Sequence, residues 1–116
     1  MKRIVTAPAK RDIADVLDWS LQQHGAAARR RYERLIARAL KAVTSRADPG
    51  GSRAFDEEVD GRRTYHLRNS RRGASGPQVG APRHLLVYAR PQPDLIVMLR
   101  LLHDAMDVPA RLQNER

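Results

Sequence analysis

The sequence predicts an α+β domain with two layers, in which a hairpin of two helices packs on one face of an antiparallel sheet. A change of hydrophobic period along the 116 residues supports this fold class. Apolar residues recur at helical spacing from residue 9 to residue 43, whereas the later apolar segments alternate or form short continuous runs, as strands do. A chain of this length fits one domain of about 100–150 residues, so we expect residues 1–116 to form a single unit.

The first two elements are expected to be a short strand and a helix. Residues 2–6, KRIVT, are rich in β-branched side chains and predict the strand. Thr6 and Pro8 predict the helix start, because threonine caps helix N-termini and proline fits the first turn. Gly25 is expected to end this helix. Its apolar stripe consists of Ile13, Val16, Leu17 and Leu21.

A second helix is expected from about Ala26, antiparallel to the first because one glycine joins them. Its apolar residues fall on one stripe: Ala28, Tyr32, Leu35, Ile36, Ala39, Leu40 and Val43. The sequence Asp-Pro-Gly-Gly at residues 48–51 is expected to end the hairpin.

The second half of the chain is predicted to supply a meander of three strands, which the first strand joins in one sheet. The strands are expected at residues 62–68, 83–90 and 95–102. The last two are apolar runs separated by the turn sequence PQPD, which indicates a hairpin. Residues 69–82 are rich in Gly, Ser and Pro and predict a long exposed loop.

Positive charge is the main feature of the composition. The chain has 22 Lys and Arg against 13 Asp and Glu, a formal net charge of +9. Residues 62–90 hold seven arginines and no acidic residue, and residues 29–41 hold five arginines and one lysine, opposed only by Glu33. Arginine suits phosphate and carboxylate groups, so the composition predicts an anionic partner, either nucleic acid or an acidic protein.

Several classes of protein are excluded or not expected. The absence of cysteine excludes disulfides, thiolate metal sites and cysteine nucleophiles. No apolar run reaches the roughly 20 residues of a membrane span, and the N-terminal sequence lacks the apolar stretch of a signal peptide, so a soluble cytoplasmic protein is expected. No phosphate-binding loop is present. The four histidines are scattered, so neither a metal nor a cofactor is expected; they are His24, His66, His84 and His103.

One group of residues on or beside the predicted strands has the chemistry for RNA cleavage, which needs a base, an acid and cations around the phosphate. The group consists of Arg63, Tyr65, His66, Arg83, His84, Arg100 and His103. Tyr65 and His66 are adjacent in a strand and point to opposite faces, so they share one pocket only if the strand bulges. The alternative is that the arginines face solvent or an acidic partner while Tyr65 packs in the core.

The order of the elements and the sequence of the last strand resemble the RelE/ParE superfamily of type II toxin–antitoxin toxins, and its ParE branch most closely. The motif is an apolar run at residues 96–99, then Arg100, two leucines and His103, followed by Met106 and Asp107. The start, I-V-T-x-P-A-x-x-D-I, adds weaker support. The resemblance covers residues 3–110 and implies the same order of strand, helical hairpin and meander.

The resemblance implies a bacterial growth-arresting toxin, of a kind linked to plasmid stabilization, that a cognate antitoxin neutralises. In the ParE branch the implied target is DNA gyrase, and the toxin has no catalytic residues. In the RelE branch the implied activity is mRNA cleavage on the ribosome, but this chain lacks the C-terminal tyrosine of the nuclease members. We therefore expect a gyrase inhibitor that acts by binding.

Two alternatives stay open. One is a ribosome-dependent endoribonuclease, whose catalytic residues would be Arg63, Arg83, Arg100 and His103. The other is a module that binds duplex DNA through residues 69–82.

The antitoxin is expected to fold a flexible, acidic segment onto the toxin, with apolar anchors between charged rims. We expect this segment to cross the helical hairpin and the edge of the sheet. Trp19, just off the apolar stripe, is either a core residue or an exposed anchor, and Leu21 lies near it. The residues predicted to contact the antitoxin or the target are Trp19, Arg34, Arg38, Arg83, Arg100, His103 and Met106.

Overall fold

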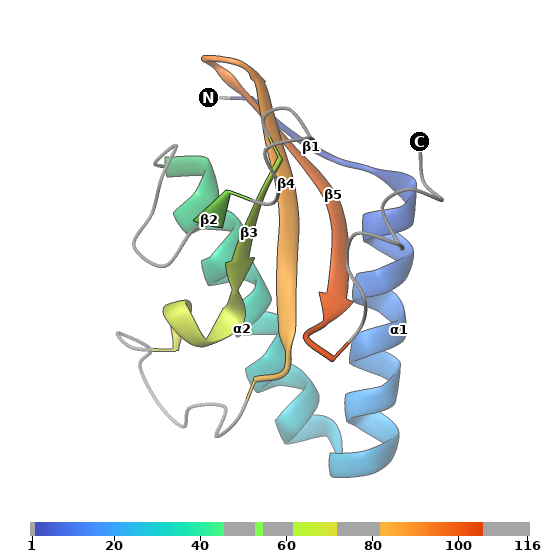
Figure 1. Cartoon of the computed structure of the whole chain (residues 1–116). Helices are drawn as coiled ribbons and strands as arrows, with labels where there is room; N and C mark the ends of the chain where they lie inside the picture. Colours follow the sequence, from blue (N-terminus) through green and yellow to red (C-terminus); the bar gives the residue numbers. More distant parts are fainter. Residues whose placement is uncertain (1, 46–52, 55–61, 72–81, 106–116) are drawn as a thin grey trace.

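The computed structural model of the chain describes residues 2–45, 53–54, 62–71 and 82–105. Its elements in chain order are strand β1 (Lys2–Val5), helices α1 (Ala7–His24) and α2 (Ala26–Ser45), strands β2 (Arg53–Ala54) and β3 (Arg62–His66), the short 3₁₀ helix η1 (Leu67–Ser70), and strands β4 (His84–Gln92) and β5 (Leu95–His103). The strands form one sheet, α2 crosses behind it, and α1 runs alongside β5 (Figure 1). The predicted α+β fold class is confirmed.

The sheet has the strand order β1-β5-β4-β3-β2. Strands β3, β4 and β5 form the predicted antiparallel meander, and β1 joins it by pairing parallel to β5, with Lys2 opposite Leu95. The two-residue strand β2 pairs antiparallel with β3 and was not predicted. A segment of two residues is too short to show the alternation by which a strand is recognised.

The third predicted strand ends earlier than expected. Strand β3 ends at His66, and the chain then turns into η1, which takes up the end of the predicted strand and the start of the predicted loop. The side chain of His66 accepts a hydrogen bond from the backbone N–H of Arg68 and so caps this short helix. Residues 72–81, the rest of the predicted loop, lie outside the described residues.

The predicted ends of α1 are confirmed by their hydrogen bonds. Thr6 accepts a bond from the N–H of Ala9 at 3.2 Å, and its hydroxyl donates to the carbonyl of Leu99 in β5 at 3.0 Å. Gly25 ends the helix with φ +90°, a left-handed conformation that glycine adopts without strain, and its N–H donates to the carbonyl of Leu21.

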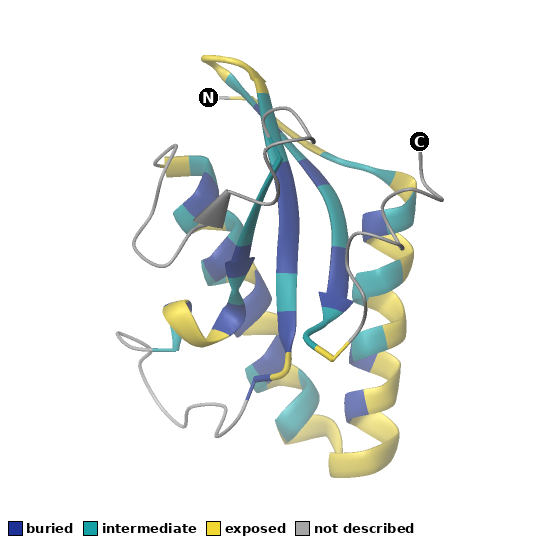
Figure 2. Cartoon of the chain, in the orientation of Figure 1, coloured by how far each residue is buried: buried dark blue, intermediate teal, exposed yellow. Residues whose placement is uncertain are grey.

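The main core lies between the helices and the sheet (Figure 2). The predicted stripe of α2 supplies five of its buried residues, which are Tyr32, Leu35, Ile36, Ala39 and Val43. The opposite face of the sheet carries a second buried pair, Val87 and Leu102. Strands β4 and β5 are therefore covered on both faces, as their nearly continuous apolar sequences predicted.

A β-bulge in β5 is where α1 is fixed to the sheet. Val87 pairs with Arg100 but Tyr88 pairs with Met98, so Leu99 is an extra residue in β5. Just after it, Arg100 donates to the carboxylate of Asp12 in α1 through Nε at 2.6 Å and Nη2 at 3.0 Å. The same carboxylate accepts the backbone N–H of Leu101 at 3.0 Å. Both side chains of this ion pair are about 15% exposed.

Replacing Asp12 with alanine is expected to lower the free energy of unfolding by about 2–4 kcal/mol. The change removes two charge-assisted bonds from a largely buried guanidinium and leaves a strand N–H without this acceptor. Asp15→Ala, on an exposed position of the same helix, is the matched control and should change stability by less than about 0.5 kcal/mol. The free energies of unfolding of both variants are measured in urea. Equally small losses of stability would mean that the ion pair makes no net contribution to the stability of the fold.

Candidate functional site

Three of the four histidines, from three different strands, meet at one end of the sheet. His66 is the last residue of β3, His84 is the first of β4, and His103 is the last of β5. His84 and His103 are opposite each other in the register of the two strands. Their rings make an edge contact with centroids 5.3 Å apart. The antiparallel pairing of the meander therefore collects histidines that are far apart in sequence.

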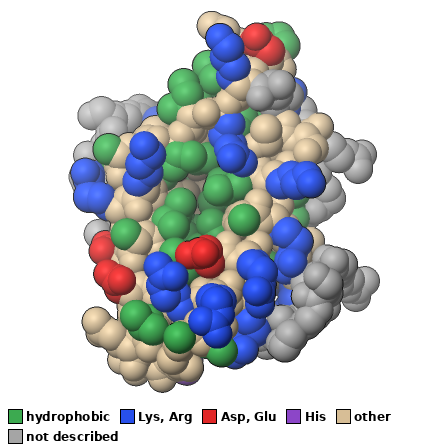
Figure 3. All heavy atoms as spheres, turned by 180° about the vertical axis from the view of Figure 1, so that it is seen from behind, with side chains coloured by type: hydrophobic (Ala, Val, Ile, Leu, Met, Phe, Trp, Pro, Cys, Tyr) green, Lys and Arg blue, Asp and Glu red, His purple; other side chains and the backbone are tan. Residues whose placement is uncertain are grey.

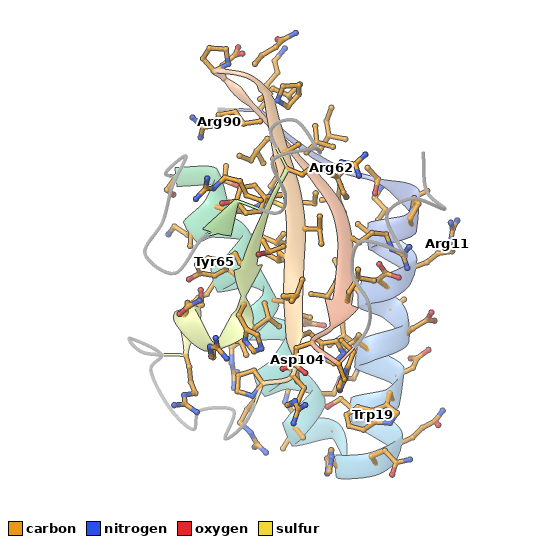
Figure 4. All side chains as sticks on the ribbon, viewed as in Figure 1. Arg11, Trp19, Arg62, Tyr65, Arg90 and Asp104 are labelled. Carbon is orange, nitrogen blue, oxygen red and sulfur yellow. The ribbon has the colours of Figure 1, made fainter. Side chains whose placement is uncertain are left out.

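The carboxylate of Asp104, directly after β5, connects this cluster (Figure 4). It accepts a hydrogen bond from Nε2 of His66 at 3.0 Å and one from Nε of Arg83 at 3.1 Å, and Nη2 of Arg83 lies 3.0 Å from it in an ion pair. Nδ1 of His103 lies 3.7 Å from it. The bond from His66, followed by the bond and charge of Arg83, lowers the pKa of Asp104 below its ordinary value of 3.8.

Tyr32 of α2 joins the same cluster from the helical layer. Its hydroxyl lies 2.6 Å from Nδ1 of His84, and it accepts the backbone N–H of Arg83 at 3.3 Å. Burial, and after it the charge of the neighbouring His103, lower the pKa of His84 to about 4. Burial also raises the pKa of Tyr32 above 10.0. His84 is therefore neutral near pH 7, and we assign the shared proton as donated by the tyrosine.

The Nδ1 atom of each histidine ring in the cluster takes part in a hydrogen bond. Each ring accepts a hydrogen bond at Nδ1: His66 from the N–H of Arg68, His103 from the N–H of Ala105, and His84 from Tyr32. A neutral ring that accepts at Nδ1 carries its proton on Nε2. Within the described part of the chain, none of the three rings therefore presents an unoccupied basic nitrogen that would take the proton of a ribose hydroxyl.

The structure brings together only part of the predicted nuclease group. Arg83 and His103 meet at Asp104, and His66 and His84 join them. Arg100 is bound to Asp12 at the bulge instead. Arg63 lies opposite Tyr88, three register positions along β3 from His66. Tyr65 is buried in the core, where its hydroxyl is 2.7 Å from Oγ of Ser70, on the opposite face of β3 from His66.

The residues predicted to contact a partner are spread over several elements. Trp19 is half exposed on α1, with its ring edge-on to His24, and Leu21 is also exposed. Two positions along a helix correspond to a rotation of about 200°, so these two side chains lie on opposite flanks of α1. On α2, Arg34 is exposed, and Nε of Arg38 donates to the carbonyl of Ser70 at 3.0 Å.

Other candidates lie at the end of the sheet or beyond the described residues. The side chain of Arg83 is 61% exposed despite its bond to Asp104, and that of His103 is 38% exposed. Met106 lies outside the described residues. Two members of the cluster, Asp104 and Tyr32, are not among the predicted site residues, and Tyr32 falls on the predicted apolar stripe of the second helix. Their roles depend on contacts over 21 and 52 sequence positions.

The chain matches the model of one protein family, described as the ParE toxin of type II toxin-antitoxin system, parDE, over residues 4–108. No curated protein matches it. Among the residues that the structure describes, no group of three or more His, Asp or Glu is arranged to hold a metal ion. In the same residues, no helix is both long and apolar enough to cross a membrane.

The stability of the fold is expected to depend on pH through His84. Its folded pKa of about 4 lies below the ordinary 6.5, so between these pH values the unfolded chain binds a proton that the folded chain does not. The free energy of unfolding should therefore fall by about 3 kcal/mol as the pH decreases from 6.5 to 4. Because its pKa is lowered in the folded state, Asp104 stabilises the fold above pH 3.8, and this contribution is lost as the pH falls below that value.

Urea unfolding at several pH values measures this dependence. His84→Gln keeps an acceptor for Tyr32 but does not titrate, so its stability should change less between pH 6.5 and 4. His24→Gln, at the exposed end of α1, is the matched control, and its free energy of unfolding should depend on pH as strongly as that of the wild type. A slope that is unchanged in the His84 variant would show that another group is responsible.

Proposed function

Because the chain belongs to the ParE toxin family of type II toxin–antitoxin systems, we propose that it arrests growth by binding DNA gyrase, without chemistry of its own. The observation that carries the proposal is the family match, which extends over residues 4–108 and so includes every described element from α1 to β5. A toxin of this kind has a cognate antitoxin as its partner.

The geometry of the histidine cluster supports binding as the mode of action. Catalysis on RNA would need a basic nitrogen close to the substrate, and the Nδ1 atoms of the cluster already accept hydrogen bonds. Two of the arginines considered for a nuclease, Arg63 and Arg100, are placed away from His103. At this end of the sheet, Arg83 presents a partly exposed, positively charged side chain that Asp104 binds.

Inhibition of gyrase is tested with the purified chain in a supercoiling assay. We expect micromolar protein to block supercoiling and to leave cleaved DNA complexes, and excess antitoxin should restore activity. The wild type is expected to leave RNA on translating ribosomes intact, and the double variant Arg83→Ala with His103→Ala should leave it equally intact. Unaffected supercoiling, combined with mRNA cleavage that this double variant abolishes, would overturn the proposal in favour of a ribosome-dependent endoribonuclease.

For the antitoxin, we propose that Trp19 is an anchor of the binding surface. Its side chain is 52% exposed, and large aromatic side chains contribute much of the binding energy in protein interfaces. The net charge of +9 would attract an acidic segment and accelerate its association. Figure 4 shows Trp19 on the lower half of α1, below Asp104 at the end of the sheet.

Trp19→Ala is expected to weaken antitoxin binding about 30-fold or more, which corresponds to roughly 2 kcal/mol for an aromatic anchor. Titration calorimetry with the antitoxin measures this loss. Gln22→Ala, an exposed residue on the same helix, is the matched control and should have little effect. Trp19 is the only tryptophan, so its fluorescence also reports contact directly. Tight binding with unchanged fluorescence would exclude the anchor role.

A further inference from the structure

The outer face of α2 carries a row of basic side chains that is separate from the histidine cluster and from Trp19. The row consists of Arg30, Arg34, Arg38 and Lys41, with Arg31 beside it. The spacing of four, four and three residues places the row on one side of the helix. The buried stripe of α2, which includes Leu35 and Ala39, lies on the other side. The row therefore points away from the core.

Acidic residues do not neutralise this row along the helix. Glu33 is the only acidic residue in α2, and it pairs with Arg29, which lies to the side of the row. Arg30, Arg34 and Lys41 are exposed. Arg38 is partly fixed by its bond to the carbonyl of Ser70, which ties η1 to α2. The view from behind the sheet shows Lys and Arg side chains gathered on this side of the molecule (Figure 3).

The geometry points to a polyanion with regularly spaced charges as the partner of this face, and we propose that it binds the phosphate backbone of duplex DNA. Successive members four residues apart are separated by about 6 Å along the helix, and the whole row spans about 16 Å. A DNA strand carries one phosphate per 3.4 Å of its axis, so the row spans about five phosphates.

An acidic protein segment fits this row less well. Protein interfaces concentrate their binding energy in apolar and aromatic anchors that are removed from water. The only exposed apolar residue between the exposed members of the row is Ala37, whereas the exposed Trp19 and Leu21 lie on α1. Contacts to phosphates need cations and no apolar anchor, and they carry no sequence preference.

This inference goes beyond the proposed function, because it requires neither gyrase nor the antitoxin. A toxin that contacts DNA directly would be concentrated on the nucleic acid that its proposed target also binds. The two proposals are separable, since binding to free DNA is measured without gyrase.

The test is fluorescence anisotropy of the full chain with a labelled 30-base-pair duplex at several salt concentrations. Arg30→Gln, Arg34→Gln and Lys41→Gln are combined in one variant, which leaves the Arg38 bond to η1 in place. The control variant changes three exposed basic residues elsewhere, Arg3, Lys10 and Arg11, to glutamine and loses the same charge. Thermal unfolding checks that both variants fold.

We expect the row variant to bind at least tenfold more weakly than the control, with the slope of log affinity against log salt reduced by about 2 to 3. Equal losses in both variants would show that net charge alone drives binding, and would overturn the proposal. So would the absence of DNA binding by the wild type. A poly-glutamate peptide is also added as a competitor, at a charge concentration equal to that of the DNA. If it displaces the DNA, and if it binds through the same three residues, the row would be assigned to an acidic protein instead.

Discussion

The ion pair between Asp12 and Arg100 fixes the relation between the two layers of the fold. The β-bulge at Leu99 shifts the register of β5 against β4 and brings Arg100 to the first half of α1. One carboxylate then binds both the guanidinium and the backbone N–H of Leu101, while Thr6, six residues before Asp12, binds the carbonyl of Leu99. Helix α1 is thereby held against β5, and the short connection at Gly25 places α2 across the rest of the sheet.

The ion pair between Asp12 and Arg100 occupies one arginine of the sheet, while other cations stay accessible. Arg100, an isolated charge in an apolar strand, has a structural use at the bulge and is largely buried. Accessible cations include Arg83, which binds Asp104 at the end of the sheet, and the basic row on the outer face of α2. Trp19 belongs to neither group. Three distinct surfaces on one small scaffold are consistent with a toxin that binds both a target and an antitoxin.

The histidine cluster shows how the register of the meander assembles residues that are distant in sequence. The strands bring His66, His84 and His103 to one end of the sheet, close to a carboxylate and an arginine. The Nδ1 atom of each ring lies within hydrogen-bond distance of a donor, which is the hydroxyl of Tyr32 or a backbone N–H. Because burial lowers the pKa of His84, which Tyr32 binds, the stability of this end of the sheet is expected to depend on pH.

The sequence by itself determined the helices, the meander and the fold class, because periodicity, caps and glycine act over a few neighbouring residues and leave a local pattern. It also indicated Arg83, His84 and His103 as chemically notable. The tertiary structure alone decided that β1 pairs parallel to β5, that η1 replaces the end of a predicted strand, and that Asp104 and Tyr32 complete the cluster. These features depend on strand register and on contacts between residues distant in sequence, and no local pattern encodes either.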